Sequence, residues 1–313
     1  MENSERLYKR LNNEFPDSSY ADEPLAPLTT YRVGGKAEIL IYPNHLDDLE
    51  HIVKLCNRYK TEFFIIGKGA NVLVHDGGFR GVVISLEKCS SQLFHEKNLL
   101  YVGAGVTVQA LVEYCEEHSL AGLDFMSGIP GTVGGALRMN AGAFVGEIGD
   151  RVLRIDAMSK QGIREQISAE EAGFGYRRAN GLQDKILLGC WLLLGPGEKR
   201  ILQRAREGYL ERRASKQPLE YPSCGSVFKR PPGDYAGRLV EAAGAKGFRV
   251  GGAMVSAKHA NFVVNEKSAT ANDIYEVIAE VQQMVYKQFK VWLELEVKLV
   301  GFPIEMVKRV EGP

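Results

Sequence analysis

Hydrophobic positions in the first part of the chain recur with two different periods. Short apolar runs at 37–43, 62–67, 81–86 and 99–105 are typical of buried strands. Residues 45–60 instead repeat with a helical period, and Thr107 can cap a second helix. The apolar faces of these two helices comprise Leu46, Leu49, Ile52, Val53 and Cys56, and then Val108, Leu111, Val112 and Cys115. This part of the chain is therefore predicted to alternate strands with helices.

A different pattern follows a glycine-rich stretch that ends near residue 143. Residues 151–168 predict a hairpin that turns near 160–162, and 185–195 predict another buried strand. A charged connector helix is expected at 198–215, and the Pro- and Gly-punctuated segment 216–233 is interpreted as a domain entrance. Beyond it we expect a helix at 235–244, a strand at 261–265, a helix at about 272–289 and a final strand at 291–301. In that last strand the alternation places Glu296 on the solvent-facing side with Trp292, Glu294 and Lys298.

Composition narrows the class of protein. The chain has 313 residues, 45% of them hydrophobic, with 39 basic and 39 acidic side chains. A formal net charge of zero argues against bulk nucleic-acid binding, which needs a basic surplus. No apolar signal region and no run of roughly 18 apolar residues is visible, so we expect a cytoplasmic protein without a membrane span. The five cysteines are scattered with no metal-binding spacing, so reduced thiols and no metal site are expected.

Two glycine clusters are the strongest candidates for chemistry. In the first, Gly67 and Gly69 follow a strand, but Val72 occupies the third position of a G-x-G-x-x-G fingerprint, so a Rossmann site is not predicted. A tight turn would also account for this cluster. The second, at 128–143, is interpreted as too glycine-rich for a helix and too long for one turn. It also contains too many apolar residues for a solvent loop, while Thr132 and Asn140 offer a hydroxyl and an amide. Together the clusters suggest a dinucleotide held mainly by backbone donors.

A series of longer motifs carries a family resemblance. The segments are "TTYRVGGKAE", "IGKGANVLVHDGGFRGVVI", "SGIPGTVGGALRMNAGAFVGEIGD", "FGYRRA", "GSVFKRP", "AAGAKGFRVGGAMVSAKHANFVVN" and "VWLELEVKLVG". Their order resembles that of the MurB family, the bacterial UDP-N-acetylenolpyruvoylglucosamine reductases, from about residue 29 to 301. The resemblance implies an enzyme of peptidoglycan precursor synthesis, and so of cell wall biogenesis, cell shape and cell division.

The resemblance also implies the fold and the cofactor. The expected fold class is α+β, with a two-lobed FAD-binding domain of the vanillyl-alcohol-oxidase (PCMH) type and a C-terminal α+β substrate domain. The lobes would comprise residues 1–80 with 298–313 returning to them, residues 81–213, and the substrate domain 214–297. FAD would be held non-covalently. The residues implied to bind it are Tyr31, Arg32, Val33, Gly67, Lys68, Gly69, Ala70, Asn71, Ser127, Gly128, Ile129, Pro130, Gly131, Thr132, Gly134, Gly135, Asn140, Ala141 and Gly142.

Three residues match the family's catalytic positions. The implied reaction reduces an enolpyruvyl ether of a UDP-sugar, with NADPH reducing the FAD first and the flavin then delivering hydride. Arg177 would stabilise the carboxylate with its planar guanidinium, and Ser226 would donate the proton. The resemblance overrides the strand pattern for Glu296 and places it at the substrate carboxylate. Without the resemblance, Ser226 would be interpreted as a turn residue and Arg177 as a surface arginine.

Further residues are implied to bind the substrate. Lys216 matches a lysine near the diphosphate, and Lys229, Arg230 and His259 are weaker candidates. Many relatives have Lys-Asn-Pro where this chain has Lys229-Arg230-Pro231. The connection from 176–178 to Lys185 is short, so the chain resembles the family type without the extra tyrosine loop, and Tyr176 is not assigned a lid role. The expected partners are small molecules, the UDP-sugar and NADPH, and the expected state is a monomer.

Two other functions stay open from the sequence. One is a different FAD-dependent oxidase or dehydrogenase of the same superfamily that acts on a sugar or alcohol. Such enzymes often tether FAD through His or Cys, and neither glycine cluster contains one, although His75 follows the first closely. The other is a non-catalytic nucleotide-sugar binding protein, against which the retained Arg177, Ser226 and Glu296 argue.

Overall fold

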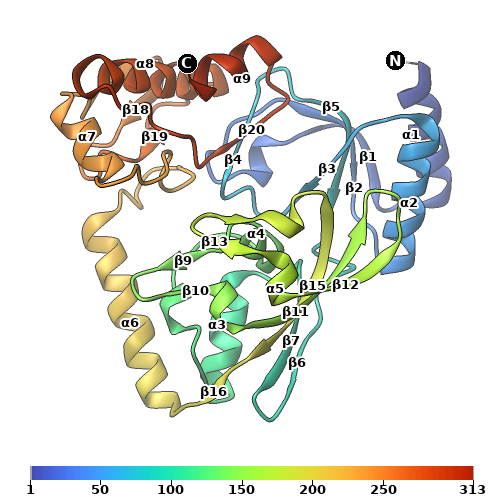
Figure 1. Ribbon diagram of the computed structural model, residues 1–313. Helices are drawn as coiled ribbons and strands as arrows, with labels where there is room; N and C mark the ends of the chain where they lie inside the picture. Colours follow the sequence, from blue (N-terminus) through green and yellow to red (C-terminus); the bar gives the residue numbers. More distant parts are fainter. Residues whose placement is uncertain (1, 313) are drawn as a thin grey trace. The chain divides into compact units, whose positions relative to one another are not determined.

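The computed structural model describes residues 2–312, and its chain divides into two compact units. Unit 1 comprises Met1–Asp22, Glu38–Lys68 and Gly81–Arg213, and unit 2 comprises Glu23–Ala37, Gly69–Arg80 and Ala214–Pro313. Both units contain helices and sheets, so the expected α+β class is confirmed (Figure 1). The division into lobes at 80/81 and 213/214 stays a prediction.

Most of the regular elements fall in unit 1. Its helices are α1 Glu2–Glu14, α2 Leu46–Tyr59, α3 Val108–Glu117, α4 Val133–Arg138, α5 Ala169–Ala172 and α6 Lys199–Lys216, whose last residues enter unit 2. Its 3-10 turns are η2 Asp124–Met126, η3 Ile148–Arg151 and η4 Asn180–Leu182. Its strands are β1 Ser19–Pro24, β2 Lys36–Ile41, β3 Phe63–Ile66, β5 Phe79–Ser85, β6 Leu93–Glu96, β7 Leu99–Gly103, β8 Leu120–Ala121, β9 Gly142–Ala143, β10 Gly146–Glu147, β11 Val152–Ser159, β12 Arg164–Ser168, β13 Phe174–Gly175, β14 Arg178–Ala179, β15 Lys185–Leu193 and β16 Gly195–Pro196.

Unit 2 is smaller and is built around one long helix. Its elements are η1 Ala26–Leu28, β4 Val72–Val74, α7 Ala236–Ala242, β17 Arg249–Val250, β18 Ala253–Val255, β19 Val263–Asn265, α8 Ala271–Phe289, β20 Lys298–Val300 and α9 Ile304–Glu311. Helix α8 packs against the β17–β18–β19 sheet, and β20 pairs with β4 in parallel (Figure 1). Buried residues of α8 such as Ile274, Val277 and Val281 supply much of the core of unit 2.

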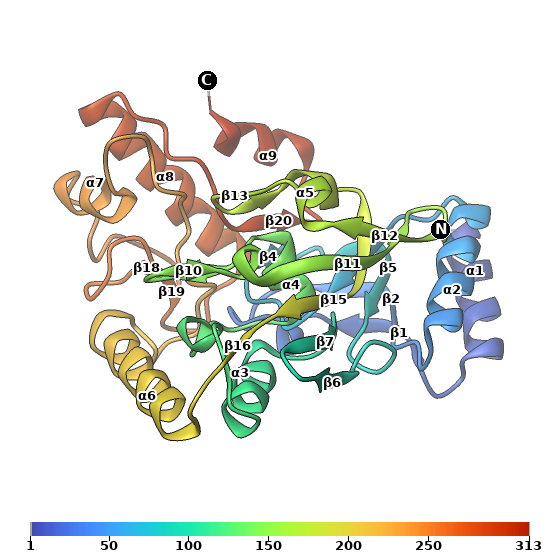
Figure 2. The same cartoon turned by 60° about the horizontal axis from the view of Figure 1, so that its bottom comes forward.

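The main sheet of unit 1 has the order β12–β11–β15–β7–β6. The predicted hairpin at 151–168 is confirmed, because Arg154 on β11 pairs with Ser168 on β12 and the register continues to Met158 and Arg164. The predicted buried strand at 185–195 is β15, which pairs with β11 and β7. A second sheet has the order β1–β2–β5–β3, and α1 and α2 lie side by side (Figures 1 and 2).

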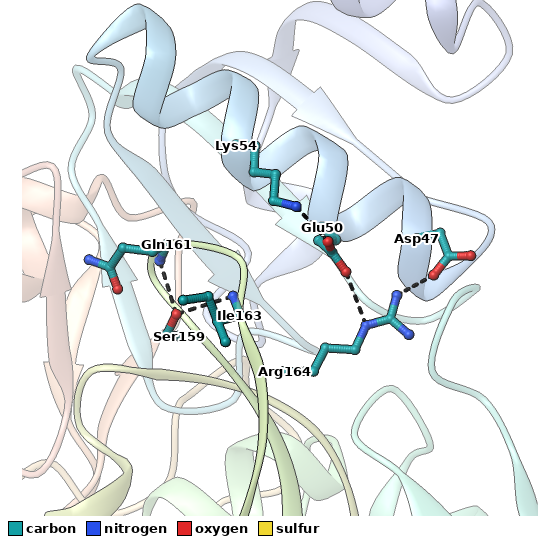
Figure 3. A network of polar contacts seen from close by, with 7 residues as sticks. All are labelled: Asp47, Glu50, Lys54, Ser159, Gln161, Ile163 and Arg164. Carbon is teal, nitrogen blue, oxygen red and sulfur yellow. Dashed lines mark hydrogen bonds and ion pairs between the residues drawn. The ribbon is translucent and has the colours of Figure 1, made fainter.

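A polar network links α2 to the β11–β12 hairpin in unit 1 (Figure 3). Arg164 on β12 forms ion pairs with Asp47 and, at 3.3 Å, with Glu50, which also pairs with Lys54. In the turn of the hairpin, the hydroxyl of Ser159 accepts hydrogen bonds from two backbone amides. Because these ion pairs are largely solvent-exposed, each adds little to stability.

Two predictions about local structure are wrong. The glycine-rich stretch does contain a helix, α4, whose first turn is capped by the Thr132 hydroxyl. A Cβ built on Gly134 would lie 3.1 Å from the Cβ of Ala104. Glycine therefore lets α4 pack closer to Ala104 than a larger residue would allow. The strand expected at 291–301 is reduced to β20, and residues before it make only one isolated bridge, between Leu295 and Phe228.

Two terminal helices were not anticipated. Helix α1 places Leu7 and Leu11 in the core of unit 1, and α9 places Val310 in the core of unit 2. Among the described residues, no helix is long and apolar enough to cross a membrane.

Candidate functional site

The two glycine clusters approach each other inside unit 1. Gly67 follows the end of β3, and a Cβ built on it would lie 3.1 Å from Cγ2 of Thr132 and closer still to its hydroxyl oxygen. The Thr132 hydroxyl also accepts a hydrogen bond from the amide of Gly135 at 3.4 Å. Glycine at position 67 is therefore a packing requirement of the contact with Thr132.

Backbone amides in both clusters are available to a ligand. Within residues 2–312, the amides of residues 67–71 donate no hydrogen bond to another protein group, nor do those of Gly128, Gly131 and Thr132. Glycines keep these stretches free of Cβ atoms, so a pyrophosphate could approach the N–H groups closely. Lys68 adds a positive charge, although its amine also forms an ion pair with Glu87 at 3.4 Å. Each cluster by itself therefore fits a phosphate group such as those of FAD.

The remaining residues of the second cluster hold the loop in shape. The buried side chain of Asn140 donates to Glu147 at 2.6 Å and to the carbonyl of Gly175 at 3.1 Å, and it accepts from the amide of Gly149. Ala141 bonds through its backbone to Ala136 and Ile148. Ile129 is partly buried and Pro130 is exposed. A role of the Asn140 side chain in cofactor binding stays a prediction.

Arg177 lies beside the second cluster in unit 1. Its backbone is left-handed, with φ of 53°, in the tight connection between β13 and β14. Its guanidinium donates to the carbonyl of Gly142 at 3.2 Å and stacks over Tyr176 at 5.2 Å. The hydrogen bond ties the predicted catalytic arginine to a loop predicted to bind the cofactor.

Arg213 is a candidate residue that the sequence reasoning missed. It lies near the end of α6, only 9% exposed, and its Nε donates to the carbonyl oxygen of Ser127 at 2.8 Å. Burial lowers the pKa of its guanidinium, and the nearby charge of Arg177 lowers it further. The sequence predicts a solvated connector helix here because α6 contains six other basic residues. They are Lys199, Arg200, Arg204, Arg206, Arg212 and Lys216. Only the tertiary contact distinguishes Arg213 from them.

In unit 2, the structure brings the segments of Ser226 and Glu296 together. The amide of Glu296 donates to the carbonyl of Val227 at 2.8 Å, and Asn71 donates from Nδ2 to the carbonyl of Glu296 at 3.0 Å. Lys229 in turn donates its amide to Glu294. Glu296 is half-buried and is not the freely exposed strand residue that its pattern indicates. A series of hydrogen bonds therefore connects Asn71, at the end of the first glycine cluster, to Glu296, and Glu296 to Val227, the residue after Ser226.

The predicted N-terminal flavin contact also lies in unit 2. Thr30 donates its amide to the carbonyl of Gly69 at 3.2 Å, which joins residues 30–33 to the first glycine cluster. Arg32 is exposed with φ of 55°, and Val33 is buried. Tyr31 is fully buried and its hydroxyl has no hydrogen-bond partner among the described residues.

Tyr31 lies next to Cys224, two residues before Ser226. Burial raises the pKa of the Cys224 thiol to about 12, and the Glu296 carboxylate contributes to that rise. All five cysteines are free and buried, so Cys224 stays a protonated, unreactive thiol at neutral pH. The cysteine packs behind the segment of Ser226 as an apolar group.

The predicted substrate-binding residues occupy separate places in unit 2. Lys216 is exposed at the end of α6. Lys229 forms an ion pair with Glu294, and Arg230 stacks over Tyr235 at 3.9 Å. His259 is partly buried, and its Nδ1 accepts from the amide of Asn261 at 3.2 Å. Over the described part of the chain, no group of three or more His, Cys, Asp or Glu side chains could hold a metal ion.

Family models match both halves of the chain. Residues 37–168 match an FAD binding domain, and residues 217–300 match the C-terminal domain of UDP-N-acetylenolpyruvoylglucosamine reductase. The chain is 39% identical over 303 residues to the UDP-N-acetylenolpyruvoylglucosamine reductase of Geobacillus kaustophilus, with 96% of this chain and 99% of the relative covered. It is 43% identical over 281 residues to that of Methylococcus capsulatus, with 89% and 92% covered.

Solved structures agree with these matches. The crystal structure of the UDP-N-acetylenolpyruvylglucosamine reductase MurB from Thermus caldophilus has a TM-score of 0.77 and 33% identity, covering 90% of this chain and 98% of that chain. A glucose dehydrogenase, Phl p 4.0202, has a TM-score of 0.50 and 17% identity, covering 61% and 44%, and shares the fold only.

Fold and site together define an FAD-binding oxidoreductase. Within that class, the chain belongs to the UDP-N-acetylenolpyruvoylglucosamine reductase family.

Proposed function

We propose that this chain uses NADPH to reduce the enolpyruvyl ether of UDP-N-acetylglucosamine, giving UDP-N-acetylmuramate, and that Arg177, Ser226 and Glu296 carry the chemistry. The observation that carries the residue assignment is the hydrogen-bonded pairing of the Val227 and Glu296 main chains in unit 2. It brings Glu296 to the residue after Ser226, although Ser226 and Glu296 are 70 positions apart and the pattern of the sequence alone would assign them to a turn and to a solvent-facing strand position.

In unit 1, the backbone amides of Gly67, Lys68, Gly128, Gly131 and Thr132 would hold the phosphates of the flavin. When bound, it passes reducing equivalents from NADPH to the substrate double bond. The protein's part is to bind the substrate carboxylate and to supply a proton to the carbon beside it. Both are tasks for fixed polar groups in a partly dehydrated site.

Each catalytic residue has a distinct task in this proposal. Arg177 binds the substrate carboxylate, because its guanidinium stays charged and can donate two parallel hydrogen bonds. Ser226 holds the proton that is transferred to carbon from its hydroxyl oxygen. Glu296 is held by Asn71 and Val227 through its backbone, and its carboxyl group acts at the substrate carboxylate.

Binding of the UDP-sugar is proposed for Lys216, Lys229, Arg230 and His259. The Lys229 ammonium can serve as a point charge for the diphosphate once it leaves its exposed partner Glu294. The monomeric state and the cytoplasmic location expected from the sequence stay predictions.

The Ser226→Ala variant tests the proposal through the two half-reactions. Stopped-flow absorbance should show that NADPH reduces the flavin at an unchanged rate, and that reoxidation by the enolpyruvyl substrate slows by about 100-fold or more. Ser223→Ala is the matched control on the same segment and should leave both rates unchanged. Equal slowing of both half-reactions in Ser226→Ala would show that the serine is not the proton donor.

The alternatives differ in simple observables. The proposed reductase is yellow, releases FAD on denaturation and oxidises NADPH only when the enolpyruvyl sugar nucleotide is present. A colourless protein that binds the nucleotide would be a binding module. Rapid reoxidation of the flavin by oxygen after reduction with a sugar or an alcohol would indicate an oxidase.

A further inference from the structure

The segment that follows Ser226 is held by one residue of unit 2, Asn261. The amide of Val227 donates to the main-chain carbonyl of Asn261 at 2.9 Å. The amide of Phe228 donates to Oδ1 of Asn261 at 3.0 Å, and Nδ2 of Asn261 donates to the carbonyl of Phe228 at 2.9 Å. Asn261 is 8% exposed, so water does not compete for these bonds.

The opposite edge of the same segment pairs with residues 294–297. Val227 accepts from the amide of Glu296, and Lys229 donates to Glu294, each at 2.8 Å. Residues 227–229 are therefore bonded on both edges, as a central strand of a sheet would be. On the other side of Ser226, Gly225 has φ of 81°, and nothing lies within 4 Å of a Cβ built on it.

We propose that Asn261 is a positioning residue that sets the place of the Ser226 hydroxyl. The inference rests on the proposed role of Ser226 as proton donor. Cys224 packs before Ser226 and a Cβ built on Gly225 would meet nothing within 4 Å, so the hydrogen bonds of Val227 and Phe228 are what fixes the backbone on the other side of Ser226. Asn261 makes three hydrogen bonds to these two residues and has no catalytic contact of its own in the proposal.

A side-chain amide is suited to this task. It presents an acceptor and a donor side by side, which match the N–H and C=O groups of one residue in an extended segment. An ionised carboxylate offers no donor, and an aliphatic side chain would leave both buried groups of Phe228 unpaired. Asn261 is itself fixed, because its amide donates to His259 Nδ1 and that ring packs against Phe262 with centroids 4.7 Å apart.

The first test is Asn261→Ala in the FAD-loaded full-length protein. We expect flavin reduction by NADPH to change less than about twofold, and reoxidation by the enolpyruvyl substrate to slow about 10- to 100-fold, since a misplacement of about 1 Å has effects of that size. Amide hydrogen exchange, measured without substrate, should be faster at Phe228, which loses its acceptor. Asn261→Ser, which keeps a hydroxyl able to replace one of the two side-chain bonds, should fall between the wild type and Asn261→Ala.

The decisive test is the double variant with Ser226→Ala. If Asn261 acts through Ser226, reoxidation in Ser226→Ala/Asn261→Ala should be no slower than in Ser226→Ala alone. Gln282→Ala is the matched control, because Gln282 is also a buried amide of unit 2 that donates to two carbonyls, those of Leu293 and Val310. Its effect on reoxidation, whatever its size, should multiply with that of Ser226→Ala.

The outcomes separate the two proposals. Fast reoxidation in Ser226→Ala would disprove the role of the serine and, with it, the inference about Asn261. If reoxidation is slow in Ser226→Ala and Asn261→Ala slows it further by the same factor as in the wild type, the positioning role of Asn261 is overturned and the role of Ser226 stands. Equal slowing of both half-reactions in Asn261→Ala, or loss of FAD from both the Ala and the Ser variants, would also overturn the positioning role, since either result assigns Asn261 to folding.

Discussion

The guanidinium of Arg213 and the carbonyl of Ser127 are joined at 2.8 Å, and this bond connects the end of α6 to the start of the second glycine cluster. The aliphatic part of the same side chain packs on the cluster, since a Cβ on Gly128 would lie 2.8 Å from Cδ of Arg213. Arg213 therefore acts as a support for the loop whose free amides are proposed to bind the flavin phosphates.

Arg213→Met is expected to weaken FAD binding by at least about tenfold. The substitution leaves a buried carbonyl unpaired, at a cost of about 1–3 kcal/mol, and removes a positive charge near the phosphates. Titration of the apoprotein with FAD, followed by the change in flavin fluorescence, measures the effect. Arg212→Met, at the exposed neighbouring position, is the control and should bind FAD like the wild type. A normal affinity in Arg213→Met would show that the loop keeps its shape without the bond.

Gly67→Ala is expected to disrupt the contact between the two glycine clusters. Gly67 has no positive φ, so alanine is conformationally allowed, and the effect is purely steric against Thr132. We expect at least about a tenfold loss of FAD affinity, because one of the two clusters must shift. Gly208→Ala, with no atom within 4 Å of its Cβ, is the control on α6 and should leave FAD binding unchanged. Unchanged affinity in Gly67→Ala would mean that the contact with Thr132 adjusts at no cost to the site.

The strands and helices with a clear period could be predicted from the sequence. The apolar run at 185–195 forms β15 because burial of both faces leaves no polar alternation, and the run at 62–67 forms β3, whose residues are mostly half-buried. Helix α4 could not be predicted, since its glycines are selected by the tight contact with Ala104 and its Thr132 cap is the only local helix signal. Apolar and polar residues alternate from 293 to 299, so the sequence does not indicate that the last strand is shortened to β20.

The candidate site divides in the same way. The glycine clusters could be predicted because glycine is chemically distinctive, and Arg177, Ser226 and Glu296 are predicted only through the family resemblance. Arg213 and Asn261 could not be found, because their importance lies in hydrogen bonds to residues 86 and 33 positions away. Such bonds leave no periodicity and no local motif.

His259 is expected to make the protein less stable in mild acid. Burial lowers the pKa of its imidazole below the ordinary 6.5, and Lys246 lowers it further. The unfolded chain then binds a proton that the folded chain does not, so the free energy of unfolding falls as the pH drops through about 6.5 toward the lowered pKa. His259→Asn, whose carbonyl can replace Nδ1 as the acceptor for Asn261, should flatten this part of the profile. Urea denaturation of both proteins between pH 5 and 8 measures the difference, and parallel profiles would contradict the assignment.

Tyr31→Phe is expected to be nearly neutral for stability, in contrast to the same change at another buried tyrosine. The Tyr31 hydroxyl has no hydrogen-bond partner among residues 2–312, and it lies beside the weakly bonding thiol of Cys224. Tyr275 is equally buried, but its hydroxyl donates to the carbonyl of Met306 at 2.9 Å. Tyr31→Phe relieves the cost of burying an unsatisfied hydroxyl but loses its weak interaction with the thiol, so the free energy of unfolding should change by less than about 0.5 kcal/mol, whereas Tyr275→Phe should lower it by about 1 kcal/mol.

The comparison of Tyr31→Phe in apoprotein and FAD-loaded protein then tests the predicted flavin contact. If the hydroxyl bonds to the bound cofactor, the variant should be destabilised only when FAD is present, and its FAD affinity should fall about fivefold for a bond of about 1 kcal/mol. If both forms are unaffected, the contribution of Tyr31 to the site is its ring packing and the backbone carbonyl that accepts from Asn265. Destabilisation of the apoprotein by as much as Tyr275→Phe would instead show that the hydroxyl has a partner within the folded chain, which would contradict the structure at this position.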